Sequence, residues 1–388
     1  MKYFCFFICL CFLPLYSTEP VVGAYVQSHS QYWPKVSGRP PFSLAFVEVS
    51  LLTDIYFAFA TFSDDFTLRL LDPNDEKVIF PGLQRLKIEG VRHVLFSVGG
   101  WNFNSKEATK ELFSKMTRSQ VSRKTFISSA LAFAKRYKFD GIDVDWEYPA
   151  DLLRGGREED LNNFLLLLQE LSEAFWPEKL LVSFCIPGLI PYGMPKRYHD
   201  TPANFYSWVS KCQKFVDRIT VMAYDYHGPF DDPKLTGVNS PLDSIEKTLE
   251  QLLTNGLLPS KLLLGLPSYG HSYSGVSGLS EGVIGPGKPF SKPGEEGSVT
   301  ALPGTLAYFE IADKIATKQL VFAANNGNAY AYNIAKEEWV SFDTPETIRL
   351  KVAKAKEKGL LGVVFWSLEM DEYYWQPRFP LLRSASLK

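Results

Sequence analysis

The chain reads Asp140-Gly141-Ile142-Asp143-Val144-Asp145-Trp146-Glu147-Tyr148-Pro149 where acidic and apolar side chains alternate most strictly. Successive side chains of a strand point to opposite faces, so Asp143, Asp145 and Glu147 share one face at a spacing of about 6.6 Å. Asp140 has the opposite parity and is interpreted as structural. The pattern predicts a strand with one apolar face and one acidic face.

Similar short apolar runs recur on both sides of this stretch, and helical patterns separate them. The predicted strands are Val21–Gln27, Leu52–Ala60, Val91–Val98, Gly141–Glu147, Lys179–Pro187, Arg218–Asp225, Lys261–Tyr269 and Leu360–Leu368. The clearest helical periodicity lies in Ser122–Lys138, Glu158–Phe175, Leu242–Asn255 and Pro345–Lys358. Apolar strands that alternate with helices indicate an α/β protein with a parallel sheet covered by helices. Eight such units predict a closed (β/α)8 barrel, the TIM barrel.

The interval between the seventh and eighth strands is too long for one connection. It holds roughly 90 residues, far more than a helix with two loops requires. Ser272–Thr305 is rich in Gly, Pro and Ser, a helix is predicted over Leu306–Ala316, and a hairpin is predicted for Gln319–Ala324 and Asn328–Asn333 around Asn325-Asn326-Gly327. We therefore expect a small α+β insertion domain at 271–341, with the barrel formed by 19–270 and 342–388.

The N-terminus predicts export. Lys2, the apolar run Tyr3–Tyr16 and the small residues that follow are typical of a signal peptide, here residues 1–18. The run is shorter than the roughly 20 apolar residues of a membrane-spanning helix, although a retained N-terminal anchor is the alternative. We expect a secreted, extracellular protein without membrane association after cleavage. Cys185 and Cys212 would then remain, as free buried thiols rather than one disulfide.

Composition narrows the class of partner. The chain of 388 residues has 41 basic and 43 acidic residues and a net charge of −2. Because no basic excess is available to neutralise phosphates, we expect no nucleic-acid partner. The aromatic fraction of 14% would suit stacking against sugar faces, although core packing uses most aromatic residues. We expect no cofactor, and a monomer is the default.

Three acids on one face inside a barrel are unusual, because packed apolar side chains normally fill that space. Like charges at this spacing share protons, which raises at least one pKa, and a raised pKa suits a general acid that works near neutral pH. A metal site and a solvated strand end are the alternatives. No metal is expected, since the five histidines show no ligand spacing.

At this point the motifs resemble those of a known family. Asp140, Asp143, Asp145 and Glu147 match the DxxDxDxE signature of glycoside hydrolase family 18, the chitinase family. Further matches follow in order: Ser97-Val98-Gly99-Gly100 continuing into Trp101-Asn102, Met222-Ala223-Tyr224-Asp225-Tyr226-His227-Gly228, Gly265-Leu266-Pro267-Ser268-Tyr269-Gly270, and Gly362-Val363-Val364-Phe365-Trp366. The resemblance spans essentially the whole mature chain.

The resemblance implies a chitinase that cleaves β-1,4-linked N-acetylglucosamine polymers with retention, through an oxazolinium ion formed by the substrate's own acetamido group. It implies that Glu147 is the general acid and base, that Asp145 orients the acetamido group, and that Asp143 shares a proton with Asp145. Tyr224 would bind the acetamido carbonyl. The implied substrate-binding residues are Tyr25, Phe59, Gly99, Trp101, Tyr148, Met222, Asp225, Tyr269 and Trp366.

Three cleft positions depart from the pattern. Animal members of the family usually carry tryptophan at the positions of His29 and Phe230 and arginine at that of His271, which puts subsite preference in doubt. Two alternatives stay open: a chitinase-like lectin, or a hydrolase of the same family that acts on the N-glycan core or on cell-wall N-acetylglucosamine. Because lectins of this kind typically replace the equivalent of Glu147, the intact acid favours an enzyme.

Overall fold

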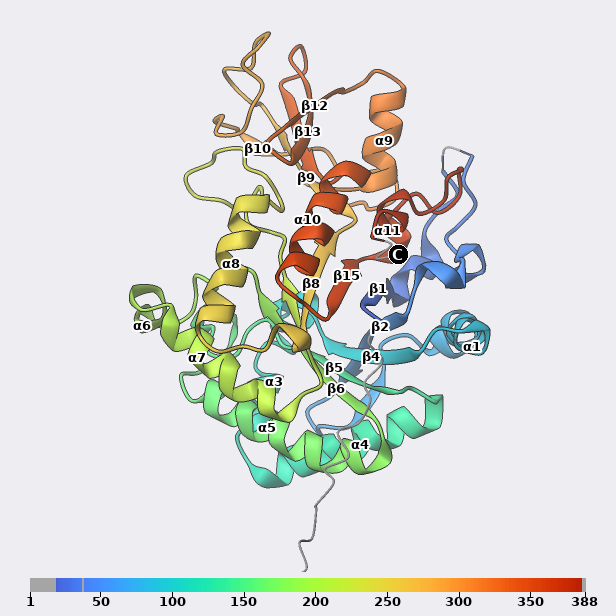
Figure 1. Cartoon of the computed structure of the whole chain (residues 1–388), viewed down its shortest axis with the longest axis vertical. Helices are drawn as coiled ribbons and strands as arrows, with labels where there is room; N and C mark the ends of the chain where they lie inside the picture. Colours follow the sequence, from blue (N-terminus) through green and yellow to red (C-terminus); the bar gives the residue numbers. More distant parts are fainter. Residues whose placement is uncertain (1–18, 37, 386–388) are drawn as a thin grey trace, which may run out of the picture.

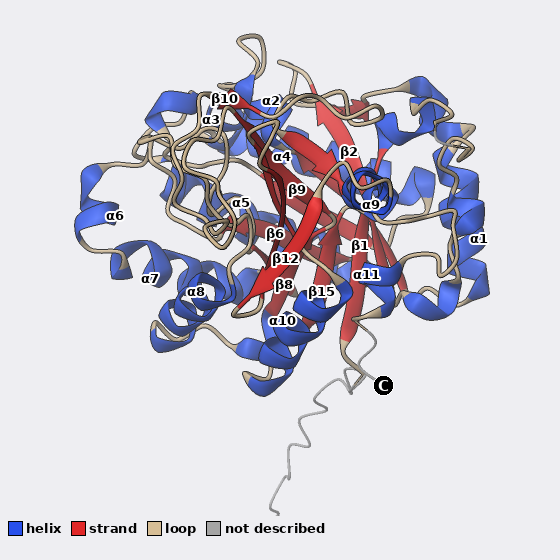
Figure 2. Cartoon of the chain, turned by 90° about the horizontal axis from the view of Figure 1, so that it is seen from above, coloured by secondary structure: helices blue, strands red, loops and turns tan. Residues whose placement is uncertain are grey.

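A computed structural model of the chain describes residues 19–36 and 38–385, so the predicted signal peptide lies outside the described residues. Parallel strands form a central barrel with helices around it, and an antiparallel sheet stands at one end (Figures 1 and 2). The barrel strands are β1 (Val21–Gln27), β2 (Asp54–Phe62), β4 (His93–Gly99), β5 (Gly141–Asp145), β6 (Leu181–Pro187), β7 (Arg218–Met222), β8 (Leu262–Pro267) and β15 (Gly362–Trp366).

The strand order confirms the predicted (β/α)8 barrel. The hydrogen-bonded order is β1-β15-β8-β7-β6-β5-β4-β2, and β1 pairs with β2 to close the ring. The short strand β3 (Leu68–Leu70) extends β2 on the outside in an antiparallel pair. Four strands end two or three residues earlier than predicted, at Asp145, Met222, Pro267 and Trp366. Beyond β7 the chain turns away from the ladder, and Asp225 has a positive φ of 58°.

Helices cover the outside of the barrel and follow the apolar periodicity of the sequence. The long ones are α1 (Ile79–Glu89), α4 (Gln120–Tyr137), α5 (Asp160–Phe175), α7 (Ala203–Cys212), α8 (Leu242–Thr254) and α10 (Pro345–Glu357), and the short ones are α2 (Trp101–Ser105), α3 (Leu112–Thr117), α6 (Lys196–Asp200) and α11 (Pro380–Arg383). In α10, Thr344 caps the backbone N–H of Thr347, and Pro345 occupies the first turn, where its missing N–H costs nothing.

Strand alternation divides the interior into two cores. Outward side chains such as Ile142 and Val144 pack against the helices. Inward side chains fill the lumen in a second cluster, whose buried members are Val21, Tyr25, Tyr56, Ala58, Leu95, Cys185, Met222, Leu263 and Val364. Arg218, the first residue of β7, closes the lumen at the N-terminal ends of the strands. It donates there to Asp54 at 2.9 Å and to the Tyr56 hydroxyl at 3.0 Å. The acids of β5 therefore project into a closed, packed space.

The insertion lies between β8 and β15, as predicted, and stands at the top of Figure 1. Its sheet has the order β10-β9-β14-β13-β12, with β11 also on β9. The elements are β9 (Tyr269–Ser274), β10 (Lys292–Pro293), β11 (Thr305–Ala307), α9 (Tyr308–Ala316), β12 (Val321–Asn325), β13 (Asn328–Asn333) and β14 (Glu338–Phe342). The predicted hairpin turns at Asn326 and Gly327, which have positive φ angles of 50° and 74°.

Three of its strands, β9, β10 and β14, lie where the sequence indicated little regular structure. Strand β9 follows β8 almost directly and runs to Ser274, inside the Gly-, Pro- and Ser-rich segment, and β14 connects the hairpin back to the barrel. Pairing of β9 with β10, β11 and β14 supplies the hydrogen bonds that local sequence did not indicate. A single residue, Ser268, therefore separates the last residue of β8 from the first strand of the insertion.

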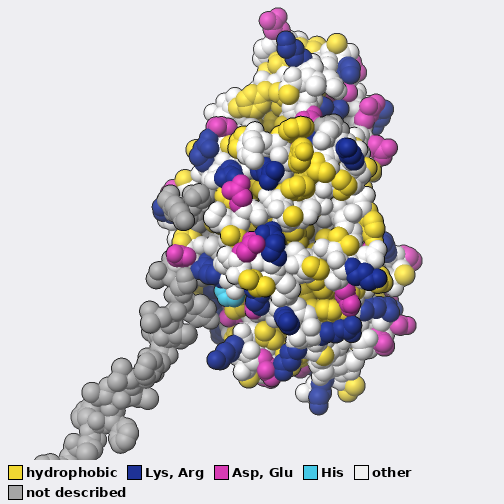
Figure 3. Space-filling model, turned by 90° about the vertical axis from the view of Figure 1, so that its right-hand side faces the viewer, with side chains coloured by type: hydrophobic (Ala, Val, Ile, Leu, Met, Phe, Trp, Pro, Cys, Tyr) yellow, Lys and Arg dark blue, Asp and Glu magenta, His cyan; other side chains and the backbone are white. Residues whose placement is uncertain are grey.

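On the face drawn in Figure 3, basic and acidic side chains are intermingled. Among the described residues, the structure contains no helix with the length and apolar character needed to cross a bilayer.

Candidate active site

Strand β5 carries the acidic file into the mouth of the barrel. Asp143 and Asp145 lie on β5, and Glu147 follows two residues after the strand ends. All three are buried, with exposed fractions of 0%, 4% and 9%. Exposure thus rises along the file, from Asp143 inside the lumen to Glu147 at the mouth. The alternation predicted from sequence thus places the three carboxyl groups on the same side of the chain segment 143–147.

Asp143 is held by donors from neighbouring strands. Its Oδ2 accepts from the Tyr25 hydroxyl of β1 at 2.9 Å and from the Ser97 hydroxyl of β4 at 2.8 Å. Ser97 is the direct register partner of Asp143, so both side chains face the lumen. Asp145 is different: its Oδ1 is buried and accepts no hydrogen bond from any described residue.

All three carboxyl groups have raised pKa values, and burial is the first cause in each. Burial raises the pKa of Asp143, and burial followed by the charges of Glu147 and Asp143 raises that of Asp145 well above its usual range. Burial also raises the pKa of Glu147 to about 7, against the lowering effects of Tyr148 and Arg154. Like-charge repulsion, which the spacing of the three acids predicts as the cause, is the smaller contribution. A group that is half-protonated near neutral pH can both give and take a proton.

Aromatic residues line the space beside the acids. The half-buried Trp366 ends β15, and its ring centroid lies 5.3 Å from that of Tyr25 and 5.6 Å from that of Phe59. Tyr25 is 2% exposed, so it lies beneath Trp366 with its hydroxyl on Asp143 and offers no open ring face. Phe59 and Trp366 keep partly exposed rings at the mouth.

The loop after β7 and the first strand of the insertion form a second wall. Met222 is buried in the lumen, and the rings of Tyr224 and Tyr269 meet edge to face at 6.0 Å. Oδ1 of Asp225 accepts from the Tyr269 hydroxyl at 2.5 Å and contacts His271 Nε2 at 2.7 Å. The barrel and the insertion therefore meet at Asp225, whose side chain is half exposed.

The remaining predicted site residues lie around Glu147. Trp101 is exposed, and the Arg154 guanidinium stacks on its ring at 3.5 Å. Arg154 also donates through Nε to the Glu147 carbonyl at 2.9 Å, while Tyr148 follows Glu147 in a half-buried position. Gly99 has a φ of 115°, and a Cβ there would stand 2.2 Å from the Asp145 carbonyl oxygen. Gly99 thus serves the close approach of two backbones.

Four residues near the acids were given no role from sequence: Ser97, Cys185, Arg154 and Asn104. Ser97 was quoted only as part of a motif, although strand parity would have turned it toward Asp143. Asn104 accepts from the Glu147 backbone N–H at 3.2 Å. Cys185 lies 3.6 Å from Asp143 Oδ2, and it and Cys212 are free, buried thiols, as expected. The contacts of Arg154, Asn104 and Cys185 depend on loops and strand order that no local pattern specifies.

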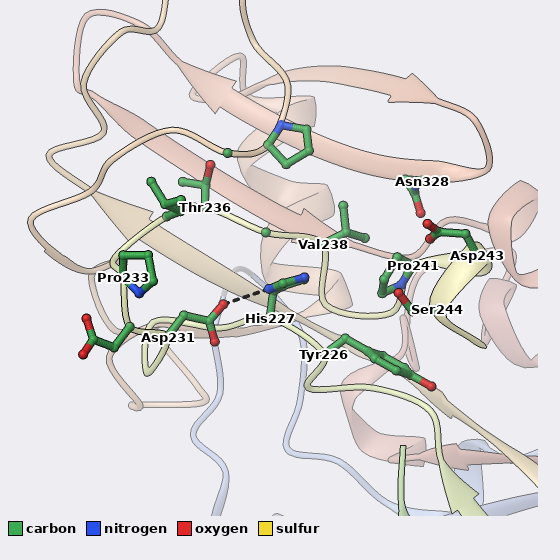
Figure 4. A pocket seen from close by; sticks show the side chains of 15 residues that line it. Tyr226, His227, Asp231, Pro233, Thr236, Val238, Pro241, Asp243, Ser244 and Asn328 are labelled. Carbon is green, nitrogen blue, oxygen red and sulfur yellow. Dashed lines mark hydrogen bonds and ion pairs between the residues drawn. The ribbon is translucent and has the colours of Figure 1, made fainter. Parts of the chain in front are cut away.

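A separate pocket of about 680 Å3 is lined mainly by the loop between β7 and α8, and none of the predicted site residues lines it. His227 pairs there with Asp231 at 2.9 Å, near the start of α8 (Figure 4). Within the described part of the chain, no group of three or more His, Cys, Asp or Glu side chains is arranged to hold a metal ion.

A (β/α)8 barrel with a buried file of acids at its mouth and aromatic rings around them defines a glycoside hydrolase. Residues 21–371 match the model of the glycosyl hydrolases family 18, and the chain belongs to this family. Mouse Chitotriosidase-1 is 32% identical over 365 residues, which cover 87% of this chain and 72% of that protein.

Solved structures agree in fold. Catalytic domain 2 of the Ostrinia furnacalis Group II chitinase, a mutant in complex with penta-N-acetylchitooctaose, (NAG)5, has a TM-score of 0.81 at 27% identity and covers 94% of this chain and 95% of that chain. Human YKL-39, described as a pseudo-chitinase with retained chitooligosaccharide binding, has a TM-score of 0.79 at 25% identity, over 95% and 98% of the two chains. The family therefore includes binders as well as enzymes.

Proposed function

We propose that this glycoside hydrolase is a secreted chitinase that hydrolyses β-1,4-linked N-acetylglucosamine polymers and oligosaccharides. The observation that carries the proposal is the buried file of Asp143, Asp145 and Glu147, in which the pKa of Glu147 is raised to about 7. Relatives named as chitinases and a neighbour in complex with (NAG)5 support the substrate class.

In the proposed reaction Glu147 donates its proton to the glycosidic oxygen as the bond to the anomeric carbon breaks. The acetamido carbonyl oxygen of the same sugar attacks that carbon and forms the oxazolinium ion. Asp145 orients the acetamido N–H, the single negative charge that Asp145 shares with Asp143 stabilises the positive charge, and Tyr224 donates to the carbonyl oxygen. Water then opens the ring from the same side as the departed sugar, and its proton returns to Glu147. The product keeps the β configuration.

Burial explains why these groups suit such a reaction. A carboxyl group that is largely excluded from water keeps its proton near neutral pH. For the same reason, its carboxylate takes a proton back readily at the end of each catalytic cycle. Asp145 has an unpartnered oxygen in this environment and is therefore available to a ligand. Trp366 would form the floor under the sugar that is cleaved, and Asp225 with Tyr269 would bind along the wall made by the insertion.

The decisive experiment is hydrolysis of fluorogenic chitobiose and chitotriose glycosides by the wild-type protein and by Glu147→Gln. We expect turnover by the wild type and a loss of at least about 1,000-fold in the variant, with oligosaccharide binding retained. Proton NMR of fresh digests should show the β anomer first. An α anomer would falsify the substrate-assisted mechanism, and turnover by Glu147→Gln near the wild-type rate would contradict the role of Glu147.

A lectin is the second candidate, favoured by the likeness to YKL-39. It predicts tight binding of chitooligosaccharides by correctly folded wild-type protein with no release of fluorophore. Product lengths from chitohexaose would separate action on chitin-like polymers from action on short glycans.

Secretion is tested separately. Expressed in eukaryotic cells, the full chain should reach the medium with an N-terminus near residue 19, whereas a chain that lacks residues 1–18 should stay inside the cells. Light scattering of the secreted protein should give the mass of a monomer.

A further inference from the structure

Cys185 brings a thiol into the acidic centre of the barrel. It lies on β6, beside β5, and its side chain belongs to the lumen cluster with Tyr25 and Met222. The side chain is 7% exposed. Its Sγ lies 3.3 Å from the Tyr25 hydroxyl oxygen and 3.6 Å and 3.9 Å from Oδ2 and Oδ1 of Asp143. The thiol therefore faces both oxygens of one carboxyl group and the hydroxyl that binds it.

The number of protons decides the direction of these contacts. Tyr25 has a single hydroxyl proton, and its 2.9 Å contact with Asp143 Oδ2 uses it. The hydroxyl oxygen of Tyr25 can then only accept from Cys185, so the thiol is the donor, either to Tyr25 or to Asp143 directly. Burial, followed by the charge of Asp143, raises the pKa of the thiol well above its usual range, so the thiol keeps its proton.

The two aspartates of β5 consequently have unequal surroundings. The Cys185 thiol lowers the pKa of both aspartates, but Asp143 also accepts from Tyr25 and Ser97, whereas Oδ1 of Asp145 is buried and unpartnered. Hydrogen bonds to a carboxylate favour its charged form, and burial without partners favours the neutral form. The arrangement therefore directs the charge to Asp143 and the proton to Asp145.

We propose that Cys185 is a positioning residue whose thiol hydrogen keeps Asp143 ionised, so that the proton of the aspartate pair resides on Asp145. This inference rests on the proposed chitinase function, in which a protonated Asp145 meets the acetamido group. Cys185 forms no covalent bond and does not touch the sugar; it acts through Asp143.

The pH dependence follows from the same contacts. The titratable groups that face the thiol are Tyr25 of β1, Asp143 and Asp145 of β5, Glu147 beyond β5 and Tyr224 beyond β7. Tyr56 of β2 interacts with Asp143. Without the thiol donor, the charged form of Asp143 is less stable, and the pair takes up its second proton at a higher pH. The acid limb of the pH profile should therefore move upward.

The test compares pH profiles of kcat/KM on a fluorogenic chitobioside for the wild type, Cys185→Ala and Cys185→Ser. The other buried thiol gives a matched control, because Cys212 on α7 packs in the outer core. We expect the acid limb of Cys185→Ala to rise by about 0.5–1 pH unit, the equivalent of one modest hydrogen bond. Cys185→Ser keeps a donor, so its limb should match the wild type or lie lower. Cys212→Ala should leave the limb unchanged.

Two results would overturn the inference if both variants fold: an unshifted acid limb of the pH profile in Cys185→Ala, or the same upward shift in Cys185→Ala and Cys185→Ser. If the alanine variant does not fold, an upward shift of the acid limb in Cys185→Ser would overturn it. A wild-type protein without turnover contradicts the proposed function and removes the inference with it. An active wild type with an unshifted Cys185→Ala contradicts the inference only.

Discussion

A Cβ at Gly99 would stand 2.2 Å from the carbonyl oxygen of Asp145, because the ends of β4 and β5 approach too closely for any side chain. The next residue along the chain, Gly100, donates its N–H to this same carbonyl at 2.8 Å. The absence of a side chain at Gly99, at the end of β4, therefore fixes the position of the Asp145 backbone at the end of β5.

We expect Gly99→Ala to lower stability by about 2–4 kcal/mol, because the new Cβ forces the strands apart and Gly99 has a positive φ. Displacement of Asp145 should also reduce kcat more than it changes KM. Urea unfolding and steady-state kinetics measure the two effects. Gly285→Ala is the control, since a Cβ there meets nothing within 4 Å. Equal stability of the two variants would contradict the close-approach argument.

Glu147→Gln should stabilise the fold at alkaline pH while it abolishes hydrolysis. Folding raises the pKa of Glu147 from 4.5 to about 7, so the unfolded chain loses this proton at lower pH and folded-state stability declines as pH rises between these values. Glutamine has no proton to lose. The variant should gain up to about 3 kcal/mol over the wild type at pH 8 and nothing near pH 4.

Thermal unfolding at both pH values measures this difference. Replacement of the exposed Glu281 by Gln is the matched control and should show no such gain. If Glu147→Gln gave the same change at both pH values, ionisation of Glu147 in the folded state would not be its cause.

Arg218→Met should destabilise the barrel by about 2–4 kcal/mol, because the fully buried Asp54 loses its 2.9 Å ion pair and keeps only the contacts with His93 at 2.6 Å and Arg92 at 3.8 Å, together with the Thr53 hydroxyl. The double variant Asp54→Asn/Arg218→Met should lose less than the sum of the single variants. Chemical denaturation gives both values. Arg197→Met, which removes an exposed pair with Glu158, should change little. Additive losses would show that Asp54 and Arg218 are not coupled.

Tyr269→Phe should raise KM for chitotriose glycosides about three- to tenfold, with a smaller change in kcat. The variant removes the hydroxyl that donates to Asp225 Oδ1 at 2.5 Å and leaves the ring in place. Tyr273→Phe makes the same chemical change on the same strand, but its hydroxyl donates to the carbonyl oxygen of Gly237, in the loop between β7 and α8. Initial rates for both variants test the assignment, and an equal KM increase in both would contradict it.

Much of the architecture could be predicted because its signals are local. The alternation around Asp143 and Asp145 indicates which side chains enter the lumen, and Asn326-Gly327 marks the hairpin turn. Strand β9 could not be predicted, since its Gly- and Ser-containing sequence becomes a strand by pairing with β10, β11 and β14, which are distant in sequence. The extent of β5 was overestimated, because alternation continues to Glu147 while the ladder ends at Asp145.

The amino-acid order alone determined that Asp143, Asp145 and Glu147 would point to one side and that a barrel would surround them, since side-chain parity and apolar periodicity act over a few residues. Only the tertiary structure decided what meets those acids. Tyr25 and Asp143 are 118 residues apart, and Cys185 reaches Asp143 across neighbouring strands. Closure of the ring makes these contacts and removes the water, and this loss of water is the main reason that Glu147 holds its proton to a pH of about 7.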